Sequence, residues 1–205
     1  MKVQLKSITP NAEINIVEIA RVSSSRTDKT EKPDGLINYL INNKHWSPFE
    51  HSFLTFEIET SKAIGIQLLR HRSFTFQEFS QRYAKVEEME PVELRYQAEK
   101  NRQSSTDIVE SVHLINMLND TIERCNQTYN KLLESGVAKE CARMVLPMCT
   151  KTTIYMTGSI RSWIHFLQIR DDGHAQKEIQ LIAKDIKSLF ISELPIISKA
   201  LNWTE

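Results

Sequence analysis

Glycine and proline are scarce in this sequence, with five and six among 205 residues. All-β proteins use both residues in many tight turns, so their scarcity disfavours an all-β fold and favours long helices. Hydrophobic residues at 40% and charged residues at 25% are ordinary for a globular protein and exclude a disordered or fibrous chain. The length suits one sizeable core, and we expect a single domain over residues 1–205.

The sequence also lacks net charge, because 26 Lys and Arg residues balance 26 Asp and Glu residues. A protein that binds nucleic acid in general is usually basic. We therefore expect no nucleic-acid partner, and any anionic ligand must be bound by a few local arginines.

Cysteines are few, and long apolar stretches are absent. The three cysteines, Cys125, Cys141 and Cys149, have neither zinc-ribbon nor Cys-x-x-Cys spacing, so we expect reduced, buried thiols and no metal site. Cys141 in particular is expected in a helix core. No run approaches the roughly eighteen apolar residues of a membrane span, and the first residues lack an apolar signal region. We expect a cytoplasmic protein with no membrane partner.

Hydrophobic periodicity predicts an α+β fold, a small and mostly antiparallel sheet packed with several long helices. Strands are expected at 3–8, 53–58 and 152–155. Helices are expected at 9–22, 33–43, 62–70, 106–133, 137–146, 159–170 and 175–190, with Gly136 as a left-handed cap after the longest. Loops are expected at 23–32 and at 74–83, where the pattern has no clean period.

The triplet Arg70-His71-Arg72 is the first candidate for binding chemistry. The planar fork of arginine binds phosphate and imide oxygens through two hydrogen bonds and keeps its charge. Taken alone, however, the triplet is more typical of a solvated basic helix end, which suits the helix dipole.

The residues that follow favour a ligand site. Within fourteen residues the chain mixes aromatic, amide, carboxylate, hydroxyl and guanidinium groups. They belong to Phe74, Phe76, Gln77, Glu78, Phe79, Ser80, Arg82 and Tyr83. Large aromatic side chains have no use on a solvated face, so the mixture suits a flat heterocycle that carries a phosphate.

The order Arg-His-Arg, seven residues, then Ser, here RHRSFTFQEFSQRY, resembles the signature of the flavin-dependent thymidylate synthases. Other segments are similar to that family in the same order and extend the resemblance over residues 14 to 185. They are Ala20 to Ser23, His45 to His51 (HWSPFEH), Glu140 to Pro147, and Arg161 to Ile179.

The resemblance implies an enzyme that methylates dUMP to dTMP. Methylenetetrahydrofolate would donate the carbon, reduced FAD the hydride, and NADPH would reduce the flavin. No enzyme thiolate would attack the uracil ring. The resemblance also implies a homotetramer whose active sites are built across subunits.

The resemblance also implies roles for particular residues. Arg170 would be the catalytic residue, polarising the uracil ring as negative charge develops on it. The dUMP-binding residues would be Gln67, Arg70, Glu78, Ser80, Arg82, Arg143 and Arg170. The FAD-binding residues would be Ser47, Arg70, His71, Arg72, Glu78, Ser159, Arg161 and His165. His45 and Tyr83 would line the space where folate or nucleotide stacks on the flavin.

His71 is expected to be largely neutral, because the neighbouring arginines disfavour its protonation. The chain departs from the family at three positions, where Gln77, Ser159 and His165 replace asparagine. Ser159 keeps a shorter hydrogen-bonding group, and His165 donates but titrates. These replacements bear on the details of flavin contact.

The sequence alone leaves several interpretations open. Arg170 could form a helix-end ion pair with Asp171 or Asp172, and Arg143 could pair with Glu140. The enzyme could transfer a one-carbon unit to another pyrimidine nucleotide, by hydroxymethylation or with dCMP as substrate. A nucleotide- or RNA-binding module that clamps phosphate with the triplet is the alternative from another class.

Overall fold

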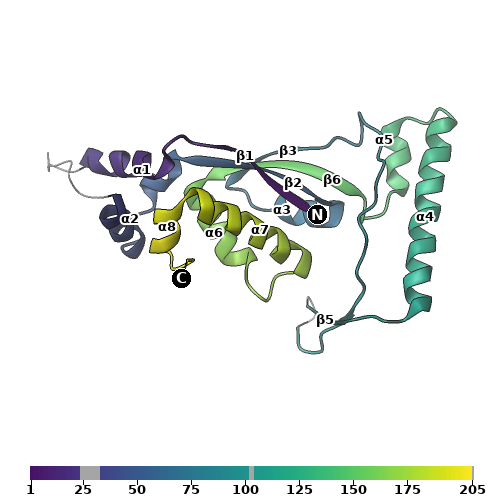
Figure 1. Ribbon diagram of the computed structural model, residues 1–205. Helices are drawn as coiled ribbons and strands as arrows, with labels where there is room; N and C mark the ends of the chain where they lie inside the picture. The colour runs from purple at the N-terminus through teal and green to yellow at the C-terminus, as the bar shows by residue number, and fades with distance from the viewer. Residues whose placement is uncertain (24–32, 102–103, 205) are drawn as a thin grey trace. The chain divides into compact units, whose positions relative to one another are not determined.

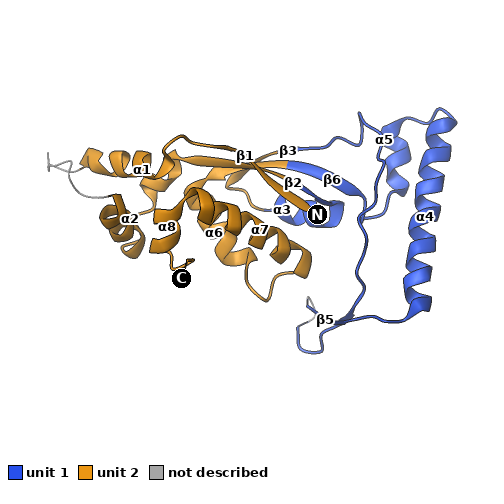
Figure 2. Cartoon of the chain, viewed as in Figure 1, with its two compact units in different colours: residues 1, 59–70, 77–154 blue, residues 2–58, 71–76, 155–205 orange. Residues whose placement is uncertain are grey.

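The computed structural model describes residues 1–23, 33–101 and 104–204 (Figure 1). These residues form two compact units (Figure 2). Unit 1 contains Met1, Glu59–Arg70 and Gln77–Ile154, and unit 2 contains Lys2–Ile58, His71–Phe76 and the chain from Tyr155 onward. Most of the loop expected at 23–32 lies outside the described residues. The single domain over residues 1–205 stays a prediction.

Unit 2 contains β1 (Lys2–Ile8) and parts of β2 (Phe53–Ser61), β3 (Phe74–Glu78) and β6 (Lys151–Ser159), in the sheet order β1-β2-β6-β3. Burial alternates along β2, where Leu54, Phe56 and Ile58 are fully buried. This period of two is typical of a strand with one face on the core. Thr55 and Thr157 join the neighbouring strands β2 and β6 through their hydroxyls, 2.9 Å apart.

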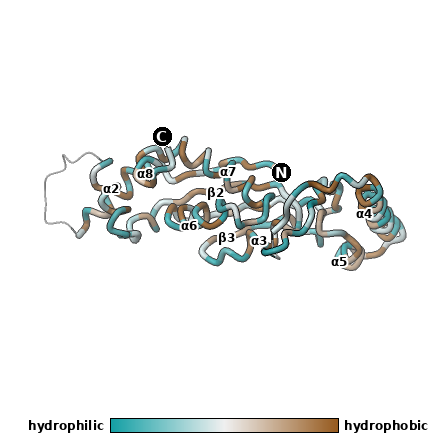
Figure 3. The backbone as a smooth tube through the Cα atoms, turned by 90° about the horizontal axis from the view of Figure 1, so that it is seen from below, coloured by the Kyte–Doolittle hydropathy of each residue, from teal (hydrophilic) through white to brown (hydrophobic). Residues whose placement is uncertain are grey.

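The helices of unit 2 follow the predicted apolar pattern. They are α1 (Ala12–Ala20), α2 (Pro33–Asn42), α6 (Ile160–Arg170), α7 (Lys177–Glu193) and α8 (Pro195–Ala200), with 3-10 turns at Arg21–Ser23 and Ser47–His51. Hydrophobic and polar residues alternate along α7 (Figure 3), and its apolar side is buried. The fully buried Trp163 on α6 packs edge-on against Phe56 and Phe74, with ring centroids 4.8 and 4.6 Å apart.

Unit 1 contains a short helix, a two-stranded sheet and the longest helix. Its elements are α3 (Lys62–Leu68), antiparallel β4 (Arg95–Gln97) and β5 (Ser105–Ile108), α4 (Val112–Glu134), α5 (Lys139–Ala142) and a 3-10 turn at Arg143–Val145. The Ser111 hydroxyl caps α4 at the backbone N–H of Leu114, and Gly136 after its end has a φ of 83°. Tyr129 is the one buried side chain of α4, and its hydroxyl accepts a hydrogen bond from the Val86 N–H.

The α+β class predicted from the sequence is confirmed, and so are the left-handed Gly136 and most of the helices. Several predictions are wrong in detail. Residues 74–78 form strand β3 instead of a loop, and the longest helix begins at Val112 because residues 105–108 pair with β4. Strand β4 and helix α8 were not predicted.

The buried positions predicted for the three thiols are only partly confirmed. Cys149 is buried and Cys125 partly buried, but Cys141 is exposed, so its predicted core position is wrong. The one-turn helix α5 buries the neighbouring Ala142 instead. Every helix in the described part of the chain is too short or too polar to cross a lipid bilayer.

Candidate functional site

The predicted catalytic arginine and the histidine of the Arg-His-Arg triplet form a hydrogen-bonded pair in unit 2. Arg170, the last residue of α6, donates its Nε–H to Nε2 of His71 at 2.9 Å. Because Nε2 accepts, the imidazole proton must be on Nδ1. The contact fixes the tautomer of His71 and the direction of the guanidinium, whose remaining N–H groups are left to bind a ligand.

His71 lies in an aromatic setting that favours its neutral form. Its ring meets Phe166 and Phe74 edge-on, with centroids 4.9 and 6.3 Å apart. Burial, the charge of Arg170 and, to a smaller extent, that of His165 lower the pKa of His71 to about 4 from 6.5. The predicted neutral state is therefore confirmed, but its largest cause is burial, not the flanking arginines.

The alternative interpretation, in which Arg170 forms an ion pair with Asp171 or Asp172, is not confirmed, because both aspartates have other partners. Asp171 accepts from Lys187 Nζ at 2.7 Å, and Asp172 accepts from the His174 ring and backbone. Burial lowers the pKa of Arg170, although a guanidinium remains charged at neutral pH. A partly desolvated cation of this kind can stabilise negative charge on a ligand more strongly than an exposed one.

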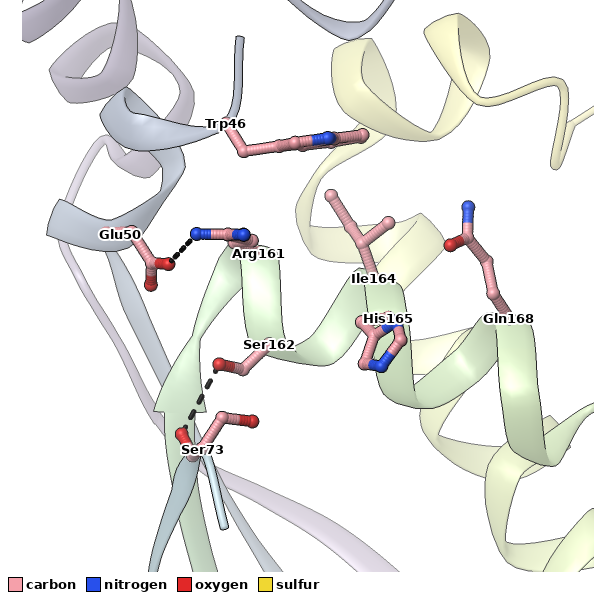
Figure 4. Close-up of a pocket in the computed structure, with 8 residues that line it drawn as sticks. All are labelled: Trp46, Glu50, Ser73, Arg161, Ser162, Ile164, His165 and Gln168. Carbon is pink, nitrogen blue, oxygen red and sulfur yellow. Dashed lines mark hydrogen bonds and ion pairs between the residues drawn. The ribbon is translucent and has the colours of Figure 1, made fainter. Parts of the chain in front are cut away.

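A cleft of about 420 Å³ in unit 2 gathers further predicted residues (Figure 4). Its walls come from the turn before β2, from the start of β3 and from one face of α6. The lining residues are Trp46, Glu50, Ser73, Arg161, Ser162, Ile164, His165 and Gln168. Arg161, Ile164, His165 and Gln168 recur at the helical spacing that places side chains on one face. The cleft thus joins the predicted FAD residues Arg161 and His165.

A carboxylate organises this cleft. Glu50 accepts from Arg161 Nη1 at 2.7 Å through one oxygen and from the Ser159 hydroxyl through the other. Ser159 is buried and also caps α6 by accepting the backbone N–H of Ser162 at 3.2 Å. Ser159 therefore acts behind the wall of the cleft, and its predicted contact with FAD stays a prediction.

Unit 1 holds most of the residues predicted to bind dUMP. Glu78, at the end of β3, is partly buried and accepts from Lys62 Nζ at 2.6 Å and from the Thr152 hydroxyl at 2.9 Å. These contacts orient a carboxylate that can accept hydrogen bonds from a pyrimidine or its sugar. The space beside it is narrow, because a Cβ on Gly65 would approach the Thr152 methyl at 3.3 Å and Glu78 Oε1 at 3.6 Å.

Other predicted dUMP residues of unit 1 lie in exposed positions. Arg82 Nε is 3.8 Å from Glu140, and both side chains are largely solvent-exposed, so this pair is weak. Glu140 therefore pairs with Arg82, whereas the alternative interpretation paired it with Arg143. Arg143 is partly buried in the 3-10 turn after α5. Tyr83 is 84% exposed.

The remaining predicted residues are spread over both units. In unit 1, Gln67 and Ser80 are partly buried and Arg70 is exposed after α3. In unit 2, His45, Ser47 and Arg72 are exposed, and the His45 ring meets Tyr39 edge-on. Their predicted roles stay predictions.

Sequence reasoning missed several residues that shape these sites. Trp46 and Glu50 lie in the segment HWSPFEH, yet only its His45 and Ser47 were given roles. Gln168 follows His165 at helical spacing, a signal that was present in the sequence. Lys62, which orients Glu78, had no signal of its own, because its partner lies on a different element.

Comparison with known proteins gives consistent matches. The model of the thymidylate synthase complementing protein family matches residues 4–196. The chain is similar to a probable flavin-dependent thymidylate synthase of Paramecium bursaria Chlorella virus 1, with 47% identity over 197 residues, 94% of this chain and 91% of that protein. A flavin-dependent thymidylate synthase of Synechocystis is 42% identical over 191 residues, 92% of this chain and 88% of that protein.

A solved structure is similar as well. The UMP/dUMP methylase PolB from Streptomyces cacaoi, bound with 5-Br dUMP, superposes with a TM-score of 0.84 at 29% sequence identity. The match covers 98% of this chain and 94% of that one. The sequence comparisons and the structural comparison therefore give related proteins over nearly the whole chain.

Proposed function

This chain belongs to the thymidylate synthase complementing protein family, and on that premise we propose that it is a flavin-dependent thymidylate synthase that converts dUMP to dTMP. Its membership makes it an enzyme, a methyltransferase. The observation that carries the proposal is the 2.9 Å hydrogen bond between Arg170 and His71. It joins the predicted catalytic residue to the histidine of the signature triplet. We propose further that residues 1–205 act as one synthase domain.

Arg170 supports the proposal through its electrostatics. The uracil ring must become electron-rich at the carbon that is methylated, so negative charge develops on the ring. A guanidinium held by His71 can donate two parallel hydrogen bonds to an imide edge and stabilise that charge. Because His71 is neutral, it adds no second positive charge and acts as an acceptor that orients Arg170.

The residues of the unit 2 cleft fit a flavin nucleotide. The cleft combines an aromatic wall at Trp46 with hydrogen-bonding groups at Arg161, His165 and Gln168, and its volume is within the range of ligand sites. We propose that Arg161 and His165 bind FAD here, together with Ser47, His71 and Arg72 of the same unit. The chemistry that reduced FAD supplies when bound is a hydride.

The residues of unit 1 support nucleotide binding. Glu78 is oriented by Lys62 and Thr152 and can accept a hydrogen bond from the nucleotide. Arg82 and Arg143 carry guanidinium groups suited to a monophosphate, and Ser80 offers a hydroxyl. The relative bound with 5-Br dUMP supports dUMP as the ligand of these residues.

Methylenetetrahydrofolate as the carbon donor, NADPH as the reductant and a cytoplasmic location remain part of the proposal. So does a homotetramer with sites built across subunits. Two kinds of exposed side chain support it. The predicted site residue Tyr83 is 84% exposed, and α4 exposes Val112 and Met117 at 68% and 55%. A second copy that covers such residues would complete the sites and remove apolar surface from water.

The test is to incubate the purified protein with dUMP, methylenetetrahydrofolate, FAD and NADPH and to assay dTMP. We expect dTMP formation that depends on each component. UMP and dCMP in place of dUMP test the alternative of another pyrimidine nucleotide. If the protein retains flavin but converts only UMP or only dCMP, that nucleotide replaces dUMP as the proposed substrate. A protein that neither binds flavin nor converts any pyrimidine nucleotide would refute the proposal.

A further inference from the structure

Trp46 is a large aromatic residue that is neither in the core nor free on the surface. It is partly buried and lines the unit 2 cleft. Its ring meets the fully buried Phe49 edge-on, with centroids 5.6 Å apart, and its carbonyl accepts the Phe49 N–H at 3.0 Å. The indole is therefore anchored from behind, and Figure 4 shows one flat face turned toward Arg161 and Ile164.

The charges of the cleft indicate what kind of group can lie against this face. The guanidinium of Arg161 is already matched by Glu50 at 2.7 Å. Ser73, Ser162 and Gln168 are neutral hydrogen-bonding residues. Among the described lining residues the one arginine is already paired, so a diphosphate would compete with Glu50 for it. An uncharged ring with polar edges would find a flat apolar wall and hydrogen-bonding partners, the imidazole of His165 among them.

The size of the cleft agrees with a ring system. Its volume of about 420 Å³ lies near the lower end of ligand sites, which span roughly 300 to 1,000 Å³. A cleft of this size accommodates one flat ring system of a larger cofactor.

We propose that Trp46 is a cofactor-binding residue on whose indole face a flat heteroaromatic ring of FAD stacks, with its polar edge toward Gln168 and the serines of the cleft. This inference rests on the proposed function, since it assumes a flavin nucleotide. The ring is either the adenine or the isoalloxazine, which share the required flatness and polar edges. Stacking of a base on an aromatic side chain is lost on truncation at a cost that corresponds to roughly 5- to 150-fold in affinity.

The experiment compares FAD binding by the parent protein with that of Trp46→Leu and Trp46→Phe. Leucine keeps apolar bulk without a ring, whereas phenylalanine keeps a ring. Trp203→Leu is the matched control, because Trp203 packs against Phe190 outside the cleft. Isothermal titration gives the dissociation constants, quenching of tryptophan fluorescence reports contact with the indole, and circular dichroism checks that each variant folds.

We expect Trp46→Leu to weaken FAD binding roughly 5- to 150-fold and to lose part of the quenching, with Trp46→Phe within a few-fold of the parent. Trp203→Leu should bind FAD like the parent. FMN, which lacks adenine, and ADP, which lacks isoalloxazine, identify the ring. If Trp46→Leu weakens the binding of FMN, the stacked ring is the isoalloxazine; if it weakens the binding of ADP, the stacked ring is the adenine. If Trp46→Leu does not fold, Trp46→Phe decides the same question, because it keeps a ring but lacks the indole. It should bind FAD within a few-fold of the parent and lose the part of the quenching that comes from Trp46, whereas quenching equal to that of the parent would overturn the stacking role.

Two results separate the failure of this inference from that of the proposed function. A parent that binds FAD, with Trp46→Leu binding it equally well, overturns the stacking role alone. So does a loss in Trp46→Phe as large as that in Trp46→Leu, because a retained ring should retain stacking. A parent that binds no FAD overturns the proposed function and the stacking role with it.

Discussion

Replacing Arg170 by lysine tests the proposed mechanism most directly. Lysine keeps the positive charge at the end of α6, so the favourable interaction with the helix dipole is retained. It removes the Nε–H that Arg170 donates to His71 at 2.9 Å and the planar fork beyond it. We expect Arg170→Lys to fold and to retain flavin but to form dTMP far more slowly.

The magnitude follows from the two interactions that are lost. One partly buried hydrogen bond contributes about 0.5–1.5 kcal/mol, so the variant should lose no more stability than that. Loss of one positioned electrostatic stabiliser typically lowers the rate on the order of 100- to 1000-fold. If Arg170 formed only a surface ion pair, its replacement should change the free energy of unfolding by about 0–1 kcal/mol and leave the rate nearly unchanged. The two interpretations therefore differ by more than tenfold in rate.

The assay is the steady-state turnover number for dTMP at saturating dUMP and FAD, with thermal unfolding measured alongside. Asp171→Asn is the control, because Asp171 pairs with Lys187 and not with Arg170. We expect Asp171→Asn to turn over like the parent. A turnover number for Arg170→Lys within a few-fold of the parent would remove Arg170 from the catalytic role and reopen the question of the substrate.

Three further predictions concern stability and chemistry. Because the pKa of folded His71 is about 4 and its ordinary value is 6.5, the unfolded chain binds a proton in this range that the folded chain does not. The free energy of unfolding should therefore fall as pH decreases from 6.5 toward 4, by up to roughly 3 kcal/mol. Denaturant titrations should show a shallower fall in His71→Phe, and an identical slope would contradict this account. Gly158→Ala should lose about 1–3 kcal/mol in the same titrations, because its Cβ would lie 2.4 Å from the Phe74 ring; unchanged stability would mean that the ring moves freely. A variant with all three cysteines replaced by alanine should still form dTMP if it folds, and its inactivity would point to a thiol nucleophile.

Periodicity predicted the parts of the fold that rest on a single buried face. The buried residues of α7, such as Ile179, Ile186 and Phe190, recur at helical spacing, and the predicted helix is present. Strand β3 was missed because its alternation is carried by Phe74 and Phe76, whose aromatic rings were taken as ligand contacts. A pattern of two aromatics in five residues does not by itself distinguish the two cases.

The error at the start of the longest helix has a similar cause. Residues 105–108 form backbone hydrogen bonds with strand β4, which lies earlier in the sequence. The local propensity of residues 105–108 does not indicate such a partner. The true start is marked by the Ser111 cap, a local signal that sequence reasoning passed over. Helix α8 also carries a signal, because Pro195 occupies its first position.

The candidate site was predictable as a set of residues but not as a set of contacts. Resemblance to a family identified Arg170 and His71, which are 99 positions apart, but their hydrogen bond depends on how α6 packs against the start of β3. The same holds for the pKa of His71, whose main cause is burial. A sequence shows neighbouring charges, but it does not show desolvation.

Ser159 stands where the resemblance to the family predicts asparagine, and it illustrates how the fold can accommodate such a departure. The shorter hydroxyl caps α6 and donates to Glu50, and Glu50 in turn holds Arg161 at the cleft. A change at Ser159 would therefore reach a ligand through the position of Arg161. Because Glu50 also matches the charge of Arg161, this chain of contacts leaves the cleft suited to an uncharged ring, which is the kind of group that the face of Trp46 can hold.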